Sequence, residues 1–352
     1  MPRFENEPTI LEAIDLQAAA SDVLGSRFNR QLLDAIREDY VAGGVARELL
    51  DAAVGRPVHD ALPLRLLSGL HRLALTGGEP SLTAQYPSCG GTPTDSLGND
   101  VVSAMTANRA FLTDALTQNV QTNEVGRSRA LVAGLSWLRR HYGYEQVQLF
   151  EMGASAGLNL CVSKFRFENA TGSTGPADSP LKFDNGWGSP VAPLFPAAEV
   201  VDTHGCDVAP INIRDEEGRT RLLSFVWPDQ HERFARLRAA IEVASGTEYK
   251  VDPEDAGPWL ERRLRSHATG VRVAWHSIAW QYFPQGTKDH VREVLEREGA
   301  AATTETPLIW LRMEPAGATA DLQATVWHGG TGENFVLARV GYHGADIEWL
   351  AD

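Results

Sequence analysis

The stretch Glu151-Met-Gly-Ala-Ser-Ala-Gly157 most constrains the fold of this chain, because it joins a strand to a helix. Val147-Gln-Leu-Phe150 before it is typical of a buried strand, and residues 158–162 after it form the apolar start of a helix. A glycine-containing turn between a strand and a helix presents backbone N–H groups and the positive helix end to a ligand. The stretch therefore predicts one unit of an α/β sheet with a ligand site at its turn.

The two parts of the chain differ in their apolar periodicity. Residues 1–140 predict helices only, because apolar positions recur every three or four residues. From residue 146 strands alternate with helices, which is typical of a mostly parallel sheet covered on both faces. We therefore expect an all-helical N-terminal domain over residues 1–140 and an α/β domain over 141–352, with an inserted loop at about 168–198.

The α/β part contains candidate strands and helices of ordinary length. The expected strands are residues 147–151, 199–207, 248–251, 271–279 and 307–314, and the expected helices are residues 157–165, 229–244, 257–267 and 288–298. Two final strands, 322–327 and 335–342, flank Gly329-Gly-Thr-Gly332 with no room for a helix. The sheet should therefore close with an antiparallel hairpin.

Composition narrows the classes of partner. The formal net charge is −14 and no long run of Lys or Arg occurs, which argues against nucleic acid as a partner. No signal-peptide pattern and no membrane-length apolar run is present, so we expect a cytoplasmic protein without a membrane partner. The three cysteines show no C-x-x-C spacing, and no His, Asp and Glu grouping has metal-ligand spacing. We therefore expect no metal.

The glycine turn admits a first interpretation as the nucleophile elbow of a serine hydrolase. Gly153-Ala-Ser155-Ala-Gly157 matches G-x-S-x-G, and Asp321 and His343 follow in the required chain order. However, the upstream region is helical and offers no oxyanion loop, and Glu151 would oppose an oxyanion beside Ser155. The hydrolase stays open as an alternative.

The second interpretation is a cofactor cradle. A carboxylate at Glu151 suits a ligand with an ammonium group, such as the methionine part of S-adenosylmethionine. Asp207 follows the next strand, where an acid could bind ribose hydroxyls, although Glu168 is nearer the usual spacing. Asp252 ends a further strand and could face the adenine amino group.

From Glu151 onward the chain resembles class I S-adenosylmethionine-dependent methyltransferases. Glu151-x-Gly153-x-Ser155-x-Gly157 resembles their first motif with Ser155 at the middle glycine, and Gly205-Cys-Asp207-Val-Ala-Pro210 resembles the second, whose acid binds ribose. Residues 274–283 resemble the fourth-strand segment, and the closing hairpin resembles the antiparallel seventh strand. The resemblance implies a Rossmann-like, mostly parallel seven-stranded sheet. Ser155 could crowd the cofactor or donate a hydrogen bond to it.

A closer resemblance covers nearly the whole chain. Gln121-Thr-Asn-Glu-Val-Gly-Arg127, the Glu151–Asn159 stretch, Val226-Trp-Pro-Asp-Gln230 and His276-Ser277 are similar to an uncharacterised bacterial family, domain of unknown function 2332. This resemblance implies no particular reaction.

Several further residues have both a functional and a structural interpretation. Asn123 and Arg127 either cap a helix or contact substrate, and Asp229 either begins a helix or lines a substrate cleft. His276 is either a core residue or a general base, with Ser277 beside it.

We expect an S-adenosylmethionine-dependent methyltransferase acting on a small molecule, with the helical domain as a lid. Glu151, Gly153, Ser155, Gly157, Asp207 and Asp252 would bind the cofactor, and His276 would be the base. Asn123, Arg127, Asp229 and Ser277 would contact the substrate. The alternatives are the serine hydrolase, a non-catalytic binding protein on the same scaffold, and a nicotinamide-dependent oxidoreductase, in which Glu151 would repel the pyrophosphate.

Overall fold

The computed structural model describes residues 8–352, and the chain divides into two compact units. The first unit comprises the chain up to Thr122 together with Ile213–Ala235, and the second comprises Asn123–Asn212 with Arg236–Asp352. This division falls earlier than residue 140, because α8 (Ser128–Tyr142) packs on the sheet: Gly134 lies against the Leu311 side chain. The sequence did not predict that the later segment Ile213–Ala235 would belong to the first unit.

The first unit is helical, as expected for the N-terminal region. Leucines and other apolar side chains of α1, α2, α4 and α6 form its core, and α4 alone buries most of its length. Helix α1 begins with a capping box in which Thr9 and Glu12 bond each other's backbone N–H groups. The helices of this unit are α1 (Ile10–Val23), α2 (Arg27–Val41), α3 (Val45–Asp51), α4 (Leu62–Thr76), α5 (Pro80–Thr83), η1 (Pro87–Cys89), α6 (Leu97–Ala107), α7 (Arg109–Thr117) and α9 (Glu216–Ser224).

The second unit contains an eight-stranded sheet of mixed type. Its order is β11-β10-β9-β8-β7-β1-β5-β6. In this spatial order, the neighbouring strands β8, β7, β1, β5 and β6 pair in parallel. The neighbouring strands β8, β9, β10 and β11 pair antiparallel. The strands are β1 (Gln146–Met152), β5 (Glu199–Asp207), β6 (Val251–Pro253), β7 (Arg272–Ser277), β8 (Leu308–Ala316), β9 (Thr319–Trp327), β10 (Glu333–Val340) and β11 (Glu348–Trp349).

The mostly parallel sheet and its antiparallel C-terminal strands are confirmed, but the expected number of seven strands is wrong. The additional strand is the two-residue β11, which is too short to give a periodic signal in the sequence. Part of the expected loop at 168–198 forms strands instead. They belong to a small three-stranded sheet of β2 (Arg166–Asn169), β3 (Gly172–Thr174) and β4 (Lys182–Phe183).

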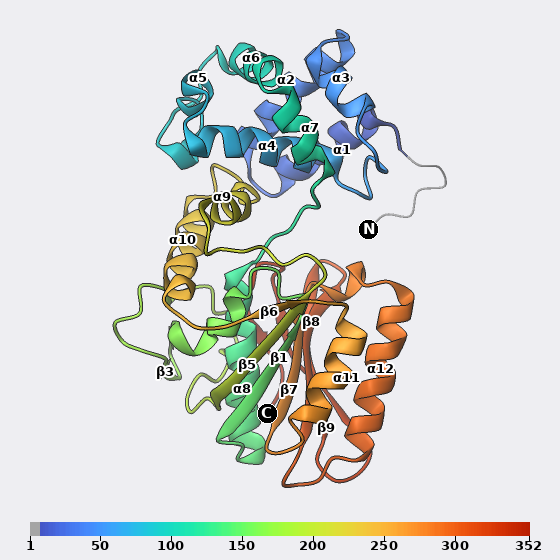
Figure 1. Cartoon of the computed structure of the whole chain (residues 1–352). Helices are drawn as coiled ribbons and strands as arrows, with labels where there is room; N and C mark the ends of the chain where they lie inside the picture. The colour runs from blue at the N-terminus through green and yellow to red at the C-terminus, as the bar shows by residue number, and fades with distance from the viewer. Residues whose placement is uncertain (1–7) are drawn as a thin grey trace. The chain divides into compact units, whose positions relative to one another are not determined.

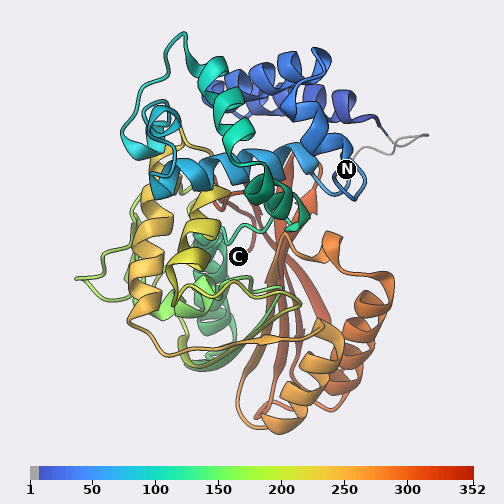
Figure 2. The ribbon, with the colours of Figure 1, turned by 45° about the horizontal axis from the view of Figure 1, so that its top comes forward.

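Helices cover both faces of the large sheet. On one face, Phe150 and Met152 of β1 pack with Trp259 of α11 (Ala256–Ser266) and Val291 of α12 (Gln285–Ala300). These two helices run side by side along the sheet (Figures 1 and 2). Helix α8 covers the other face. Successive side chains of a strand point to opposite faces, so Leu149 and Glu151 of β1 point to the α8 side. The remaining helices are η2 (Val125–Arg127), η3 (Leu158–Lys164), η4 (Trp280–Tyr282) and α10 (His231–Ser245).

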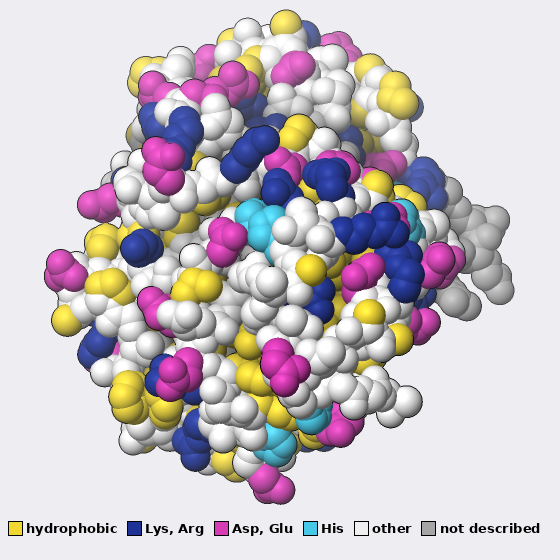
Figure 3. Space-filling view, turned by 60° about the horizontal axis from the view of Figure 1, so that its bottom comes forward, with side chains coloured by type: hydrophobic (Ala, Val, Ile, Leu, Met, Phe, Trp, Pro, Cys, Tyr) yellow, Lys and Arg dark blue, Asp and Glu magenta, His cyan; other side chains and the backbone are white. Residues whose placement is uncertain are grey.

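The surface and the helices bear on the partner classes considered above. On the face drawn in Figure 3, basic and acidic side chains are interspersed rather than gathered by sign. Among residues 8–352, no helix combines the length and apolarity that crossing a membrane requires.

The close approach of α8 to β8 gives a test of this packing. A Cβ at Gly134 would lie 2.8 Å from Leu311 Cδ2, so Gly134→Val should overpack the core and cost about 1–3 kcal/mol of unfolding free energy. Urea unfolding followed by circular dichroism measures the loss. Gly286→Ala is the control, since nothing lies within 4 Å of its added Cβ. Equal stability of Gly134→Val and the wild-type chain would contradict this packing.

Candidate functional site

Four polar side chains end neighbouring strands at one edge of the sheet. Glu151 stands near the end of β1, Asp207 at the end of β5, Ser277 at the end of β7 and Glu314 near the end of β8. These strands are parallel, so their carboxyl ends meet at the same edge. In open α/β sheets that edge is where ligands bind.

Glu151 is a buried carboxylate with an incomplete set of partners. Its side chain belongs to a residue that is 2% exposed, and Oε1 accepts from Asn159 Nδ2 at 3.3 Å. Oε2 is buried and has no hydrogen-bond partner among the described residues. Burial raises the pKa of Glu151 to about 8, and the charge of Asp207 adds to the rise, while Asn159, Trp275 and Arg127 oppose it. Burial therefore outweighs the donors and the positive charge that act on this carboxyl, and Oε2 has no hydrogen bond of ordinary geometry.

Other buried polar atoms surround Glu151 on the α8 side of the sheet. Ser128 on α8 donates to Asn159 Oδ1 at 2.7 Å and so orients that amide toward Glu151. Trp275 is the register partner of Glu151 on β7, and its indole favours the charged carboxylate. Its Nε1, like Ser155 Oγ, is buried without a hydrogen-bond partner in the described part of the chain. A buried polar atom without a hydrogen bond costs free energy, and three such atoms lie around the end of β1 and the start of the turn.

The glycine turn is held by this chain's own groups. Gly153 and Gly157 have φ of 71° and 76°, and a Cβ at Gly157 would lie 2.5 Å from the Tyr249 ring. A Cβ at Gly153 would lie 2.9 Å from Ala279 Cβ. Both glycines are therefore required by local backbone conformation and by packing.

The expected row of free amides is absent from this turn. Ala154 N donates to Cys206 O, Ser155 N to Asp207 Oδ2, and Leu158 N to Asn123 Oδ1, each at 2.9 Å. The expected helix at 157–165 is the seven-residue 3-10 helix η3, whose first amide is the one capped by Asn123. A helix therefore does follow the turn, as expected, but its first amide is bound by Asn123, and two amides of the turn are bound by Cys206 and Asp207.

The expected cofactor acids Asp207 and Asp252 differ in exposure and in the charge of their partners. Asp207 is partly exposed and accepts from Ser155 N and Ala209 N at the mouth of the turn. Asp252 is buried and accepts from Trp259 Nε1 at 2.9 Å and from Arg263, with Lys250 Nζ at 3.0 Å. Although burial raises its pKa, the hydrogen bonds from Arg263, Lys250 and Trp259 together lower it well below the usual range. The Asp252 carboxylate therefore forms ion pairs with Arg263 and Lys250 of the same chain.

Glu168 is not at a strand end of the large sheet. It lies on β2 of the small sheet, where Oε1 accepts from Arg166 Nε at 2.7 Å.

His276 lies on the opposite face of the sheet from Glu151. Its side chain points to the same face as that of Ala274, the face covered by α12. Its ring stacks on Trp280 with ring centres 5.1 Å apart. Trp310 Nε1 donates to its Nε2 at 3.0 Å, so Nδ1 carries the hydrogen and donates to Glu314 Oε1 at 2.6 Å. Both ring nitrogens are thus engaged and the side chain is fully buried, which favours the structural interpretation of His276 over a general base.

Glu314 organises the loop that follows β7. Its Oε1 also accepts from Ala279 N at 3.1 Å and from Trp280 N at 3.2 Å, while Oε2 is buried without a partner in residues 8–352. Glu314 was not predicted as a functional residue, since its only signal in the sequence is its position near the end of a strand.

The expected substrate residues are not gathered at one point. Arg127 donates to the backbone oxygens of Tyr342 and Ser277, both at 3.1 Å, and so ties the ends of β7 and β10 together. Asn123 caps η3, as described above. Asp229 lies in the first unit and accepts from Ser26 Oγ and Phe28 N at the start of α2.

A second polar group lies elsewhere on the sheet. Asp202 and His204 of β5 and His267 after α11 offer ligand atoms that all lie within 4.8 Å of one another. This grouping was not predicted, because His267 is distant in sequence from Asp202 and His204. The Asp202-Thr-His204 spacing, which places both side chains on one face of a strand, was the available signal.

Comparison with known proteins identifies a family but no characterised relative. A family model described as "Uncharacterized protein conserved in bacteria (DUF2332)" matches residues 12–349. No curated protein and no solved structure matches the chain.

The buried carboxyl predicts a distinctive pH dependence of stability. The pKa of Glu151 is raised from 4.5 to about 8, so folding favours its protonated form. This contribution is fully present below pH 4.5 and is lost as the pH rises through about 8. We expect the melting temperature of Glu151→Gln to rise relative to wild type across this range.

Thermal melts followed by circular dichroism at a series of pH values measure this difference. Glu296→Gln, which removes an exposed carboxylate of α12, is the control and should follow the wild-type profile. Parallel profiles for Glu151→Gln and wild type would show that Glu151 is not buried in this way.

Proposed function

The chain belongs to this bacterial family, and we propose that it is an S-adenosylmethionine-dependent methyltransferase acting on a small molecule. The proposal rests on the resemblance of its motifs and on the buried acid at the carboxyl edge of the sheet.

The topology supports a Rossmann-like interpretation of the second unit. The strand that ends near Glu151 is the first of the sheet in sequence and lies inside it, between β5 and β7. Parallel strands β6-β5-β1-β7-β8 are followed by antiparallel ones, as in the resembled methyltransferases. The sheet departs from that pattern in having eight strands and three antiparallel pairs.

The single observation that carries the proposal is the unpaired Oε2 of Glu151. An ammonium group would supply a hydrogen-bond donor to Oε2 and a full positive charge beside this buried carboxyl. In the free protein the raised pKa keeps Glu151 largely protonated at neutral pH. A bound ammonium would favour the carboxylate and lower that pKa.

Side chains rather than free amides would hold the cofactor. Glu151 would bind the ammonium, with its own orientation fixed by Asn159 and Ser128. Asp207, which is partly exposed beside the turn, would accept from ribose hydroxyls. Asp252 has no part in this proposal, because Trp259, Arg263 and Lys250 already engage its oxygens.

When bound, the cofactor would supply a methyl group on a positively charged sulfur. The contribution of the protein would be to hold an acceptor in line with that methyl group and to exclude water, and positioning alone accounts for a large part of the rate in such reactions. No side chain is proposed as a base, since both nitrogens of His276 are engaged.

Calorimetry with S-adenosylmethionine and its demethylated product tests this function. At pH 7 we expect saturable binding of both, with release of up to about one proton per site as the pKa of Glu151 falls from about 8. Comparing buffers of different ionisation enthalpy measures that proton. Glu151→Gln should bind more weakly without releasing it, whereas Glu296→Gln should match wild type. Absence of heat from either ligand at millimolar concentration would overturn the proposal.

A serine hydrolase is the second candidate, because Ser155 has an unusual backbone. Its φ is 55°, a conformation that non-glycine residues rarely adopt, and its Oγ is unpaired. Strain of this kind occurs at nucleophile elbows. Against it, no imidazole among the described residues hydrogen-bonds to Ser155 Oγ.

Ser155→Gly separates the two candidates. Glycine accepts the positive φ, so the change should raise the unfolding free energy by about 1 kcal/mol in either case. For a methyltransferase it restores the middle glycine of the motif and should retain or tighten cofactor binding. For a hydrolase it abolishes reaction with a fluorophosphonate probe. Probe labelling of wild type at Ser155, lost in the variant, would favour the hydrolase.

A further inference from the structure

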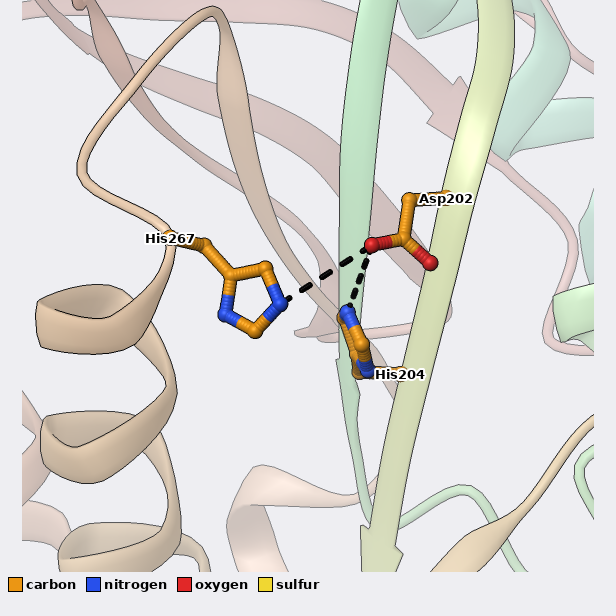
Figure 4. Close-up of side chains that lie close together, drawn as sticks. All are labelled: Asp202, His204 and His267. Atoms are coloured by element: carbon orange, nitrogen blue, oxygen red, sulfur yellow. Dashed lines mark hydrogen bonds and ion pairs between the residues drawn. The ribbon is translucent and has the colours of Figure 1, made fainter.

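Two strand residues and one residue after a helix bring three metal-ligand side chains together. Asp202 and His204 are two apart on β5, so both point to the face covered by α11. His267 follows directly after α11 and faces them (Figure 4). His204 Nε2 lies 2.9 Å and His267 Nε2 lies 3.9 Å from Asp202 Oδ2, so two imidazoles share one carboxylate oxygen.

The hydrogen-bond partners of His267 determine which nitrogen is available. Its Nδ1 lies 2.9 Å from both the carbonyl oxygen of Arg263 and Ser266 Oγ. The carbonyl oxygen can only accept, and Ser266 Oγ donates to that same oxygen, so we assign the hydrogen to Nδ1. In the neutral ring Nε2 is then an acceptor that faces the Asp202 carboxylate, another acceptor. A cation between these atoms would satisfy both. A backbone carbonyl bound to the far ring nitrogen is also the usual arrangement behind a metal-ligating histidine.

Aromatic packing fixes the position of the two imidazoles. His204 stacks on Phe150 with ring centres 5.3 Å apart, and the His267 ring lies edge-on to Phe150 at 5.6 Å. The His204 and His267 ring centres are 4.4 Å apart. The guanidinium of the neighbouring Arg263 is paired with Asp252.

We propose that Asp202, His204 and His267 bind a divalent transition-metal ion of the zinc type, with at least one further position left for water. Two imidazoles and a carboxylate suit zinc, whereas calcium and magnesium prefer oxygen ligands throughout. Zinc bonds of about 2.0–2.1 Å require ligand atoms roughly 3.3 Å apart. The observed atoms, within 4.8 Å of one another, reach this by small side-chain rotations.

This metal site is separate from the cofactor site proposed above. Asp202 lies five residues before Asp207 on the same strand, which places it about 16 Å from the carboxyl end of β5. The ion would connect β5 to the segment between α11 and β7, and it would stabilise the second unit by binding only its folded form.

Zinc titration of untagged, chelator-stripped full-length protein tests the proposal. We expect one zinc ion per chain by calorimetry and a higher melting temperature with zinc than without. Asp202→Asn and His267→Gln should each weaken zinc binding by more than the roughly 10–100-fold that loss of an outer-shell partner costs. His290→Gln is the matched control, because His290 also contacts an acid, Glu261, at 3.2 Å and should bind zinc like wild type.

Two results would overturn the site. One is the absence of saturable zinc binding by wild type, and the other is equal binding by wild type, Asp202→Asn and His267→Gln. Cobalt titration of the wild-type chain gives a readout that needs no variant: a low-coordinate nitrogen and oxygen site produces visible absorption bands, and an unchanged aqueous cobalt spectrum would count against the proposal.

Discussion

Parallel pairing of β1 with β5 on one side and β7 on the other is the constraint on which the second unit depends. It places the end of β1 inside the sheet, where Glu151 is buried. The same pairing aligns Glu151 with Trp275 and brings Asp207 to the adjoining turn. A carboxyl group at such a position would be costly in a protein selected for stability alone, because its charged form lacks a partner. Its presence there is the strongest physical argument for a ligand.

The polar side chains at the carboxyl ends of β1, β7 and β8 point to different faces of the sheet, although the strands are neighbours. Glu151, Asn159 and Ser128 lie on the α8 side, whereas His276, Glu314 and Trp310 form a connected group on the α12 side. Side-chain alternation causes this separation, since positions 151 and 276 have opposite parity relative to their paired neighbours. The histidine group holds the loop after β7, whereas Glu151 on the other side keeps Oε2 without a hydrogen bond among the described residues.

Much of the fold was predictable because apolar periodicity is a local property. Strands β1, β5 and β8 and helices α11 and α12 are close to their expected positions, and the antiparallel end follows from the short turns there. The two-residue β11 and the 3-10 form of η3 were not predictable. The first is too short for a period, and the second depends on Asn123 and Asp207, which bind amides of the turn from other parts of the chain.

The sequence by itself determined the α/β class of the second unit, the helical N-terminal region and the position of Glu151 at a strand end. Only the tertiary structure decided which polar residues are engaged. Asp252 is paired with Arg263, and both ring nitrogens of His276 are hydrogen-bonded. Glu151 Oε2 has no hydrogen bond among the described residues, and His267 lies beside Asp202 and His204. The physical reason is that a side chain's role depends on burial and on its nearest donor or acceptor, and both are set by segments far apart in sequence.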